Sequence, residues 1–288
     1  MGIQANHRQI QHNLKPALHN RPLHGVEGGH PVGWMKASFL ILAVLLAGPL
    51  GAEAPPLLRD ALLKVAQDKG RWAFTESDKM RNGQDKVVDS TVLRFDPSKP
   101  YADQYVPMQV HGHPPTKADF EKYRQRGIQR GRGLERAEAE GKPAPGRTLG
   151  DVVDLDHAAV STEDAATATY EVPLRADNNE RFPPDKFQVL VRVNKAERAL
   201  EHVSVRLRAP IRYALVLKVK SGELEADFAR VDPKHSPAMT TVTGGGAVSV
   251  FFVPVTRSGE MIRSDFRHVR PFDERFNVEI GPTKALDF

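Results

Sequence analysis

The residues of this chain best suited to chemistry are two histidines separated by a single glycine, His111 and His113. Side chains two positions apart on a strand share a face, so both imidazoles can reach one metal ion. A catalytic zinc site also needs a third protein ligand and a water molecule, and the chain has no HExxH pattern. Because two prolines follow the pair, we interpret it as a loop and predict no metal site; a metal-dependent hydrolase using His111 and His113 is the third-ranked function. The convenient additional ligands are Asp103, Asp154, Asp156 and His157.

Other catalytic patterns are missing from the sequence. The chain has no cysteine, and it contains no Gly-x-Ser-x-Gly elbow around a nucleophilic serine. The three glycines at 244–246 precede a predicted strand rather than a helix, so they do not predict a phosphate-binding loop. We therefore expect a protein without a cofactor that is not an enzyme.

The segment 127–150 is unusual in composition because it combines six glycines with several arginines. Arginine and glycine together make an adaptable basic strand that can contact phosphates or polyanions. Glu135, Glu138 and Glu140 dilute that charge. We therefore interpret the segment as a flexible, solvated insertion, and we expect the preceding helix to end near Gly127.

The stretch from Phe187 to Phe228 indicates the fold. Apolar residues occupy alternate positions in three successive runs, over 187–193, 200–208 and 213–220; a break at 194–198 separates the first two, and Ser221-Gly222 separates the third from a further run over 224–228. This period of two predicts consecutive antiparallel strands with one buried face and one polar, basic face. The opposite parity carries Arg192, His202, Ser204, Arg206, Arg208, Lys218 and Lys220.

Flanking elements are predicted by their own signals. Apolar spacing predicts a helix over 57–69, closed by Gly70. Asn82-Gly83 lies between two alternating runs and predicts a hairpin. Thr116 followed by Asp119 predicts the N-terminus of a second helix. The glycines at 244–246 predict the start of a strand over 247–255, and 257–260 predicts a tight turn before a last strand.

The N-terminal region predicts export. Residues 35–52 contain a lysine near the start, then an apolar run, then a cleavage region of small residues. This is the pattern of a secretory signal peptide, and we expect cleavage after Ala52. The apolar run is too short to span a bilayer, so no transmembrane segment should remain after cleavage. Residues 1–34 carry five of the eleven histidines and are either a metal-binding tail or, in the favoured interpretation, sequence upstream of the true start at Met35. We expect a periplasmic or secreted protein with a single domain over 53–270 and a C-terminal tail over 271–288.

Charge and cysteine content narrow the class of partner. The whole chain has 41 basic and 36 acidic residues, a net charge of +5. Four of the basic residues and one acid precede residue 53, which leaves 37 against 35, a net charge of +2. This small excess removes the main argument for a nucleic-acid partner. Without disulfides, an exported chain must be stabilised by its core.

This order of elements resembles the lipoprotein-carrier family of the Gram-negative periplasm, the LolA and LolB type. Two stretches carry the resemblance: the hairpin from Phe187 to Arg208, and the segment from Phe95-Asp96-Pro97 to the Pro114-Pro115-Thr116 motif. The resemblance implies a mainly β (α+β) fold in which a curved antiparallel sheet forms an unclosed half-barrel with a few covering helices. It also implies an apolar space for acyl chains. The segment 127–150 departs from that family's pattern.

The first-ranked function is therefore the binding of a lipid acyl chain or a lipid-modified protein in an apolar cavity. A structural or interaction protein of the cell envelope with a filled core is the alternative. A basic sheet face is a candidate surface for anionic membranes. The predicted cavity residues are Trp72, Phe74, Val189, Val191, Val205, Leu215, Leu217 and Phe252, and the predicted anionic-surface residues are Arg206, Arg208, Arg212, Lys218 and Lys220.

Overall fold

The computed structural model describes residues 54–68, 70–141, 152–175, 183–213, 217–250 and 253–275. The predicted upstream extension 1–34 and signal peptide 35–52 lie outside these residues. Most of the predicted tail 271–288 lies outside them as well.

One antiparallel sheet of eleven strands dominates the structure. The strands lie in the order β3-β2-β1-β11-β10-β9-β7-β6-β5-β4, and β8 pairs with β9. Because β3 and β4 are the edges and do not pair with each other, the sheet is not closed into a barrel. This confirms the predicted mainly β fold with an open antiparallel sheet. The strands are β1 (Trp72–Asn82), β2 (Val87–Phe95), β3 (Tyr105–Val110), β4 (Ala159–Glu163), β5 (Thr167–Glu171), β6 (Phe187–Asn194), β7 (Ala199–Leu207), β8 (Ile211–Tyr213), β9 (Leu217–Ala229), β10 (Ala238–Val250) and β11 (Val253–His268).

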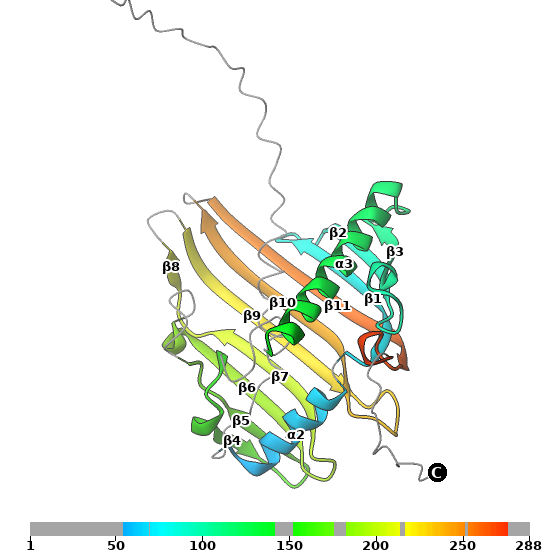
Figure 1. Cartoon of the computed structure of the whole chain (residues 1–288). Helices are drawn as coiled ribbons and strands as arrows, with labels where there is room; N and C mark the ends of the chain where they lie inside the picture. The colour runs from blue at the N-terminus through cyan, green and yellow to red at the C-terminus, as the bar shows by residue number, and fades with distance from the viewer. Residues whose placement is uncertain are drawn as a thin grey trace, which may run out of the picture.

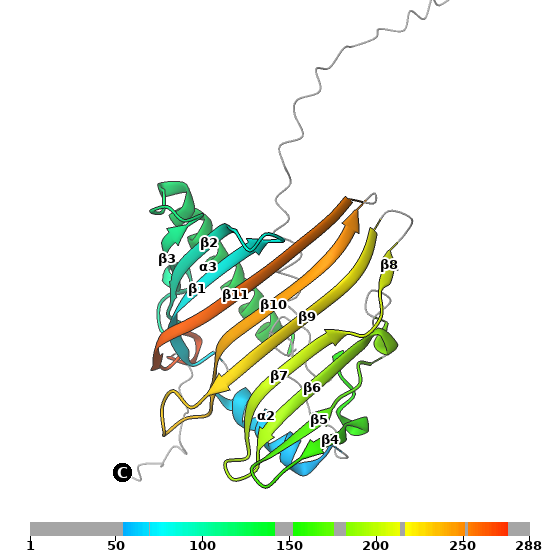
Figure 2. The same cartoon turned by 180° about the vertical axis from the view of Figure 1, so that it is seen from behind.

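Two helices, α2 (Pro56–Gln67) and α3 (Lys117–Ala139), lie on the same face of the sheet, which we call the inner face (Figure 1). The opposite, outer face is seen in Figure 2, where both helices lie behind the strands. In the described part of the chain, no helix combines the length and apolarity needed to cross a membrane.

Helix α2 forms because its apolar residues recur at helical spacing and can be buried together. Leu58, Ala61, Leu62 and Val65 are all buried, and the helix packs across β6 and β7. The side chains beneath it are the inward-facing valines of those two strands, including Val191 and Val193 on β6. Both faces of this contact are apolar, so burial of nonpolar surface holds α2 in place.

Helix α3 begins as predicted and ends much later. The Thr116 side chain accepts a hydrogen bond from the Asp119 N–H, and the Asp119 carboxylate accepts one from the Thr116 N–H, a complete capping box. The helix continues through Gly127 to Ala139, so the prediction of a flexible loop from residue 127 was wrong for residues 127–139. Gly127 and Gly131 are buried against a short 3₁₀ turn, η1 (Tyr101–Asp103). The two glycines therefore allow α3 to pack closely against η1. Residues 142–150 of the predicted insertion lie outside the described residues.

Three breaks predicted from the sequence were wrong, because each of them lies within one of the long strands β9, β10 and β11. Ser221-Gly222 lies within β9, the glycines at 244–246 lie within β10, and residues 257–260 lie within β11. These glycines pair with one another across strands, as in Gly222 with Gly246 and Gly244 with Gly259. A local turn signal was thus overridden by the hydrogen-bonded ladder of neighbouring strands.

Candidate functional site

The inner face contains an apolar core beneath α2. Val189, Val191 and Val205 lie in this core with 2%, 4% and 6% of their surface exposed. They pack against α2 and against inward residues of β9, β10 and β11, such as Ala226 and Val242. Three of the predicted cavity residues are therefore members of the packed core.

A second apolar group, which we call the apolar row, lies at the other end of the longest strands. Ile211, Val219, Val248 and Val255 are cross-strand neighbours, one each on β8, β9, β10 and β11. Val248 has the same parity along β10 as the core residue Val242, so the row belongs to the inner face. Figure 1 shows that neither α2 nor α3 lies over this end of the strands.

The apolar row continues toward the ends of the strands. Leu217 on β9 and Val253 on β11 follow it in the sheet register, and Val253 is 61% exposed. Of the predicted cavity residues, only Leu217 lies here. Leu215 and Phe252 lie outside the described residues.

Glycines separate the apolar row from the core. Gly222, Gly244, Gly246 and Gly259 occupy inner-face positions of three adjacent strands. A Cβ atom at Gly246 would lie 2.8 Å from the Ser221 carbonyl oxygen, and one at Gly244 would lie 3.1 Å from the Glu223 carbonyl oxygen. Such close approaches of neighbouring strands explain why positions 244 and 246 lack side chains.

Arg257 lies between this glycine strip and the apolar row. It pairs with Gly246 in the sheet and has the same parity as Val255, so it too belongs to the inner face. Its Nη1 group donates to the Thr256 carbonyl oxygen at 3.3 Å. Its Nε atom is buried and has no hydrogen-bond partner within the described part of the chain. A buried donor without an acceptor costs about 1–3 kcal/mol, and a guanidinium group is suited to bind carboxylates and phosphates.

Beneath α3 the inner face is charged. Glu76 on β1 is buried and accepts two contacts from Arg263 on β11, at 2.9 Å from Nε and 2.8 Å from Nη2. The Arg263 guanidinium also lies over the Phe74 ring, 4.2 Å from its centroid. Burial raises the pKa of Asp78 to about 7; the nearby Glu76 carboxylate raises it as well, while Arg263 and Arg126 lower it. Phe74, a predicted cavity residue, is therefore part of a polar, charged region.

Trp72 lies at the start of β1, away from both apolar groups. Its ring contacts Phe266, His235 and His268 edge-on, at centroid distances of 6.0, 5.6 and 5.0 Å. Trp72 is therefore packed among aromatic and imidazole rings and does not line an apolar cavity with the other predicted residues.

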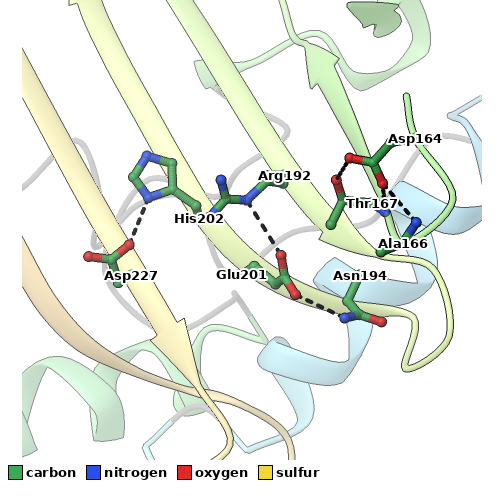
Figure 3. A network of polar contacts seen from close by, with 8 residues as sticks. All are labelled: Asp164, Ala166, Thr167, Arg192, Asn194, Glu201, His202 and Asp227. Carbon is green, nitrogen blue, oxygen red and sulfur yellow. Dashed lines mark hydrogen bonds and ion pairs between the residues drawn. The ribbon is translucent and has the colours of Figure 1, made fainter. Parts of the chain in front are cut away.

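The outer face carries acids as well as the predicted basic residues. Figure 3 shows His202 on β7 paired with Asp227 on β9 at 2.8 Å, and Arg192 on β6 paired with Glu201 on β7 at 3.4 Å. The Glu201 carboxylate also accepts from the Asn194 side chain at 2.9 Å. The face beside the central strands therefore has mixed charge.

The predicted anionic-surface residues divide into two groups. Arg206 pairs with Glu225 at 3.0 Å, and Arg208 pairs with Glu171. Arg212 and Lys218 are cross-strand neighbours on β8 and β9, with Lys220 two positions on. No carboxylate lies within ion-pair distance of these last three residues in the part of the chain described. A basic cluster thus accompanies the apolar row, on the same strands.

His111 and His113 directly follow β3. His111 Nδ1 lies 2.9 Å from an Asp89 carboxylate oxygen, and both histidines are exposed. No group of three metal-ligating side chains in the described ranges includes either histidine. Asp154 and His157, which sequence suggested as further ligands, pair with each other at 2.8 Å.

A different cluster of ligating side chains is formed by Asp68, His235 and His268, which we call the Asp-His-His cluster. Their candidate ligand atoms all lie within 4.8 Å of one another. Burial works to raise the pKa of Asp68, but hydrogen bonds from Ser236 and His268 lower it, and the net shift is downward. Asp68 is therefore ionised at neutral pH. The three residues are far apart in sequence, so no spacing motif could have revealed them.

Comparison with known proteins yields no relative for this chain: no family model, curated protein or solved structure matches it.

Proposed function

We propose that this protein is an exported binding protein for a lipid acyl chain carrying an anionic head, without enzymatic activity. In this proposal the acyl chain of the lipid lies along the apolar row, and its anionic head group lies at Arg257. The observation that carries the proposal is the buried, unpaired Nε of Arg257 directly beside Val255 and Val248 on the inner face. The signal-peptide pattern and the resemblance to lipoprotein carriers support the same assignment.

The energetics favour a long apolar chain with one charged end. Each methylene buried stabilises a complex by about 0.8 kcal/mol, so affinity should rise steeply with chain length. A carboxylate or phosphate accepting from the guanidinium would contribute about 1.5–3 kcal/mol, because charge-assisted hydrogen bonds are stronger than neutral ones. The basic cluster of Arg212, Lys218 and Lys220 would also attract an anionic amphiphile to this end of the sheet.

The first experiment measures binding along the apolar row with a matched pair of variants. Purified protein is delipidated and titrated with a long-chain fatty acid, and complexes are counted by native mass spectrometry without detergent. Val255→Asp places a charge on the inner face, whereas Thr256→Asp places the same charge one residue away on the outer face. We expect Val255→Asp to abolish uptake and Thr256→Asp to retain it, with thermal unfolding confirming that both variants are folded.

The second experiment tests the head-group contact. Arg257→Gln should weaken binding of the fatty acid about tenfold or more and leave binding of the corresponding fatty alcohol unchanged. Absence of fatty-acid uptake by the wild-type protein would refute the proposal and favour an envelope interaction protein. An equal loss for acid and alcohol in Arg257→Gln would refute the assigned orientation.

A further inference from the structure

We propose that the Asp-His-His cluster of Asp68, His235 and His268 is a binding site for a divalent transition-metal ion of the zinc type. Two imidazoles and one carboxylate are a donor set suited to Zn²⁺ and its neighbours in the first transition row. The cluster lies at the opposite end of β11 from the apolar row, since β11 runs from Val253 to His268. The two proposals can therefore fail independently.

Three separate elements bring the ligands together. Asp68 directly follows α2, His235 lies in the loop between β9 and β10, and His268 is the last residue of β11. Their side chains are 16%, 28% and 19% exposed. Partial burial separates this cluster from the solvated carboxylate groups that are common on protein surfaces, while leaving a path for an ion to enter.

Neighbouring groups hold the cluster in position. The Ser236 N–H donates to one Asp68 oxygen at 2.8 Å, and the other oxygen lies 3.2 Å from His268 Nε2. Trp72 packs edge-on against both imidazoles and forms one wall of the cluster. Ser236 and Trp72 are outer contacts, and contacts of this kind orient metal ligands and raise affinity.

Ion binding requires a small rearrangement of the two histidines. Their rings are stacked, with centroids 3.5 Å apart and planes at 11°. Stacked rings do not direct their lone pairs to one point, so one imidazole must turn, and ligand atoms at about 2.1 Å from a shared ion must close to about 3.4 Å from one another. His235 is the ring suited to turn because it lies in a loop, and Asp232 lies 3.9 Å from its Nε2 as a nearby further carboxylate.

A bound ion would link the end of α2 to the sheet. It would join the helix, the β9–β10 loop and β11 at one point, and so fix α2 over the apolar core. Because the unfolded chain does not assemble these ligands, the ion should raise the midpoint of thermal unfolding, and above the dissociation constant this rise should grow with the logarithm of the ion concentration.

The experiment must distinguish this site from the five histidines that precede residue 35. Trp72 provides a local signal, and the chain has one other tryptophan, Trp34. The full chain carrying Trp34→Phe is titrated with Co²⁺, and quenching of Trp72 fluorescence is followed, with Zn²⁺ as a competitor. We expect saturable quenching with one equivalent, reversed by Zn²⁺.

Variants assign the signal to the three ligands. His235→Ala and His268→Ala should each weaken Co²⁺ binding at least tenfold, while the control His111→Ala with His113→Ala should leave it unchanged. If an alanine variant does not fold, as judged by its thermal unfolding, His268→Gln and Asp68→Asn replace it. Lack of saturable Trp72 quenching, or equal quenching in the histidine variants and the control, would overturn the proposal.

Discussion

At the scale of single residues, the environment of Asp78 shows how position in the sheet decides chemistry. Asp78 lies on the inner face of β1, beside Glu76 and across from Met261 on β11. Asp78 shares the parity of Trp72 and Phe74 along β1, so its side chain lies on the same face as these rings. The pairing of β1 with β11 and the cover of α3 place it in a partly buried, charged region, where its pKa is raised to about 7.

This raised pKa predicts a specific pH dependence of stability. Between about pH 4 and pH 7 the unfolded chain has lost the Asp78 proton while the folded protein retains it, so the free energy of unfolding falls as pH rises through this window. Asp78→Asn removes that dependence. We expect the variant to match wild type below pH 4 and to be more stable at pH 8, by on the order of 2 kcal/mol.

Urea unfolding at a series of pH values measures this difference. The matched control is Asp85→Asn, in the turn between β1 and β2, where the side chain is 84% exposed. The control should follow the wild-type curve. An Asp78→Asn curve parallel to wild type from pH 4 to pH 8 would contradict the assigned pKa.

At the scale of elements, α3 is held by contacts that a hydrophobic pattern does not reveal. Its arginines lie over aromatic rings: Arg126 over Tyr105 at 4.5 Å and Arg130 over Phe95 at 5.7 Å. The Arg130 guanidinium also donates to the buried Gln104 side chain at 2.8 Å. The glycine and arginine residues that suggested a flexible insertion are therefore the contact residues of a helix.

Substitution of the two buried glycines tests this packing. A Cβ atom at Gly127 would lie 1.8 Å from the Tyr101 carbonyl oxygen, and one at Gly131 would lie 2.2 Å from the Tyr101 ring. We expect Gly127→Ala and Gly131→Ala each to lower the free energy of unfolding by about 2 kcal/mol or more, despite the higher helix propensity of alanine.

A double-mutant cycle separates the two clashes. Tyr101→Ala removes the ring but keeps the backbone carbonyl, so it should relieve the cost of Gly131→Ala and leave the cost of Gly127→Ala unchanged. Chemical denaturation of the single and double variants gives the coupling. Equal coupling for both glycines would show that α3 does not pack on η1 as described.

At the scale of the whole molecule, the pairing of β1 with β11 joins the first and last strands of the described part of the chain in one sheet. This pairing runs from Trp72 opposite His268 to Asn82 opposite Arg257. It brings the Asp-His-His cluster together at one end and leaves the apolar row at the other. The glycine strip between the core and the row allows β9 and β10 to approach closely.

The glycine strip gives a prediction about the sheet as a whole. Gly246→Ala places a methyl group 2.8 Å from the Ser221 carbonyl oxygen, whereas Gly222→Ala meets only the Leu207 Cβ at 3.9 Å. We expect Gly246→Ala to destabilise the protein by about 1–3 kcal/mol. Gly222→Ala on the paired strand should be neutral or stabilise it by about 0.5 kcal/mol. Thermal unfolding of the two variants measures this contrast, and equal effects would argue against the close approach at Gly246.

The sequence by itself determined the fold class and much of the local structure. The alternation from Phe187 onward specified antiparallel strands, Asn82-Gly83 specified the first hairpin, and Thr116 with Asp119 specified the start of α3, because these signals depend only on neighbouring residues. Tertiary structure decided the rest. Glycines at 222, 244–246 and 259 look like turns until their partners across the sheet are known, and the environments of Arg257, Asp78 and the Asp-His-His cluster depend on contacts between residues far apart in sequence. Such contacts are set by the register of the sheet, and no local pattern encodes them.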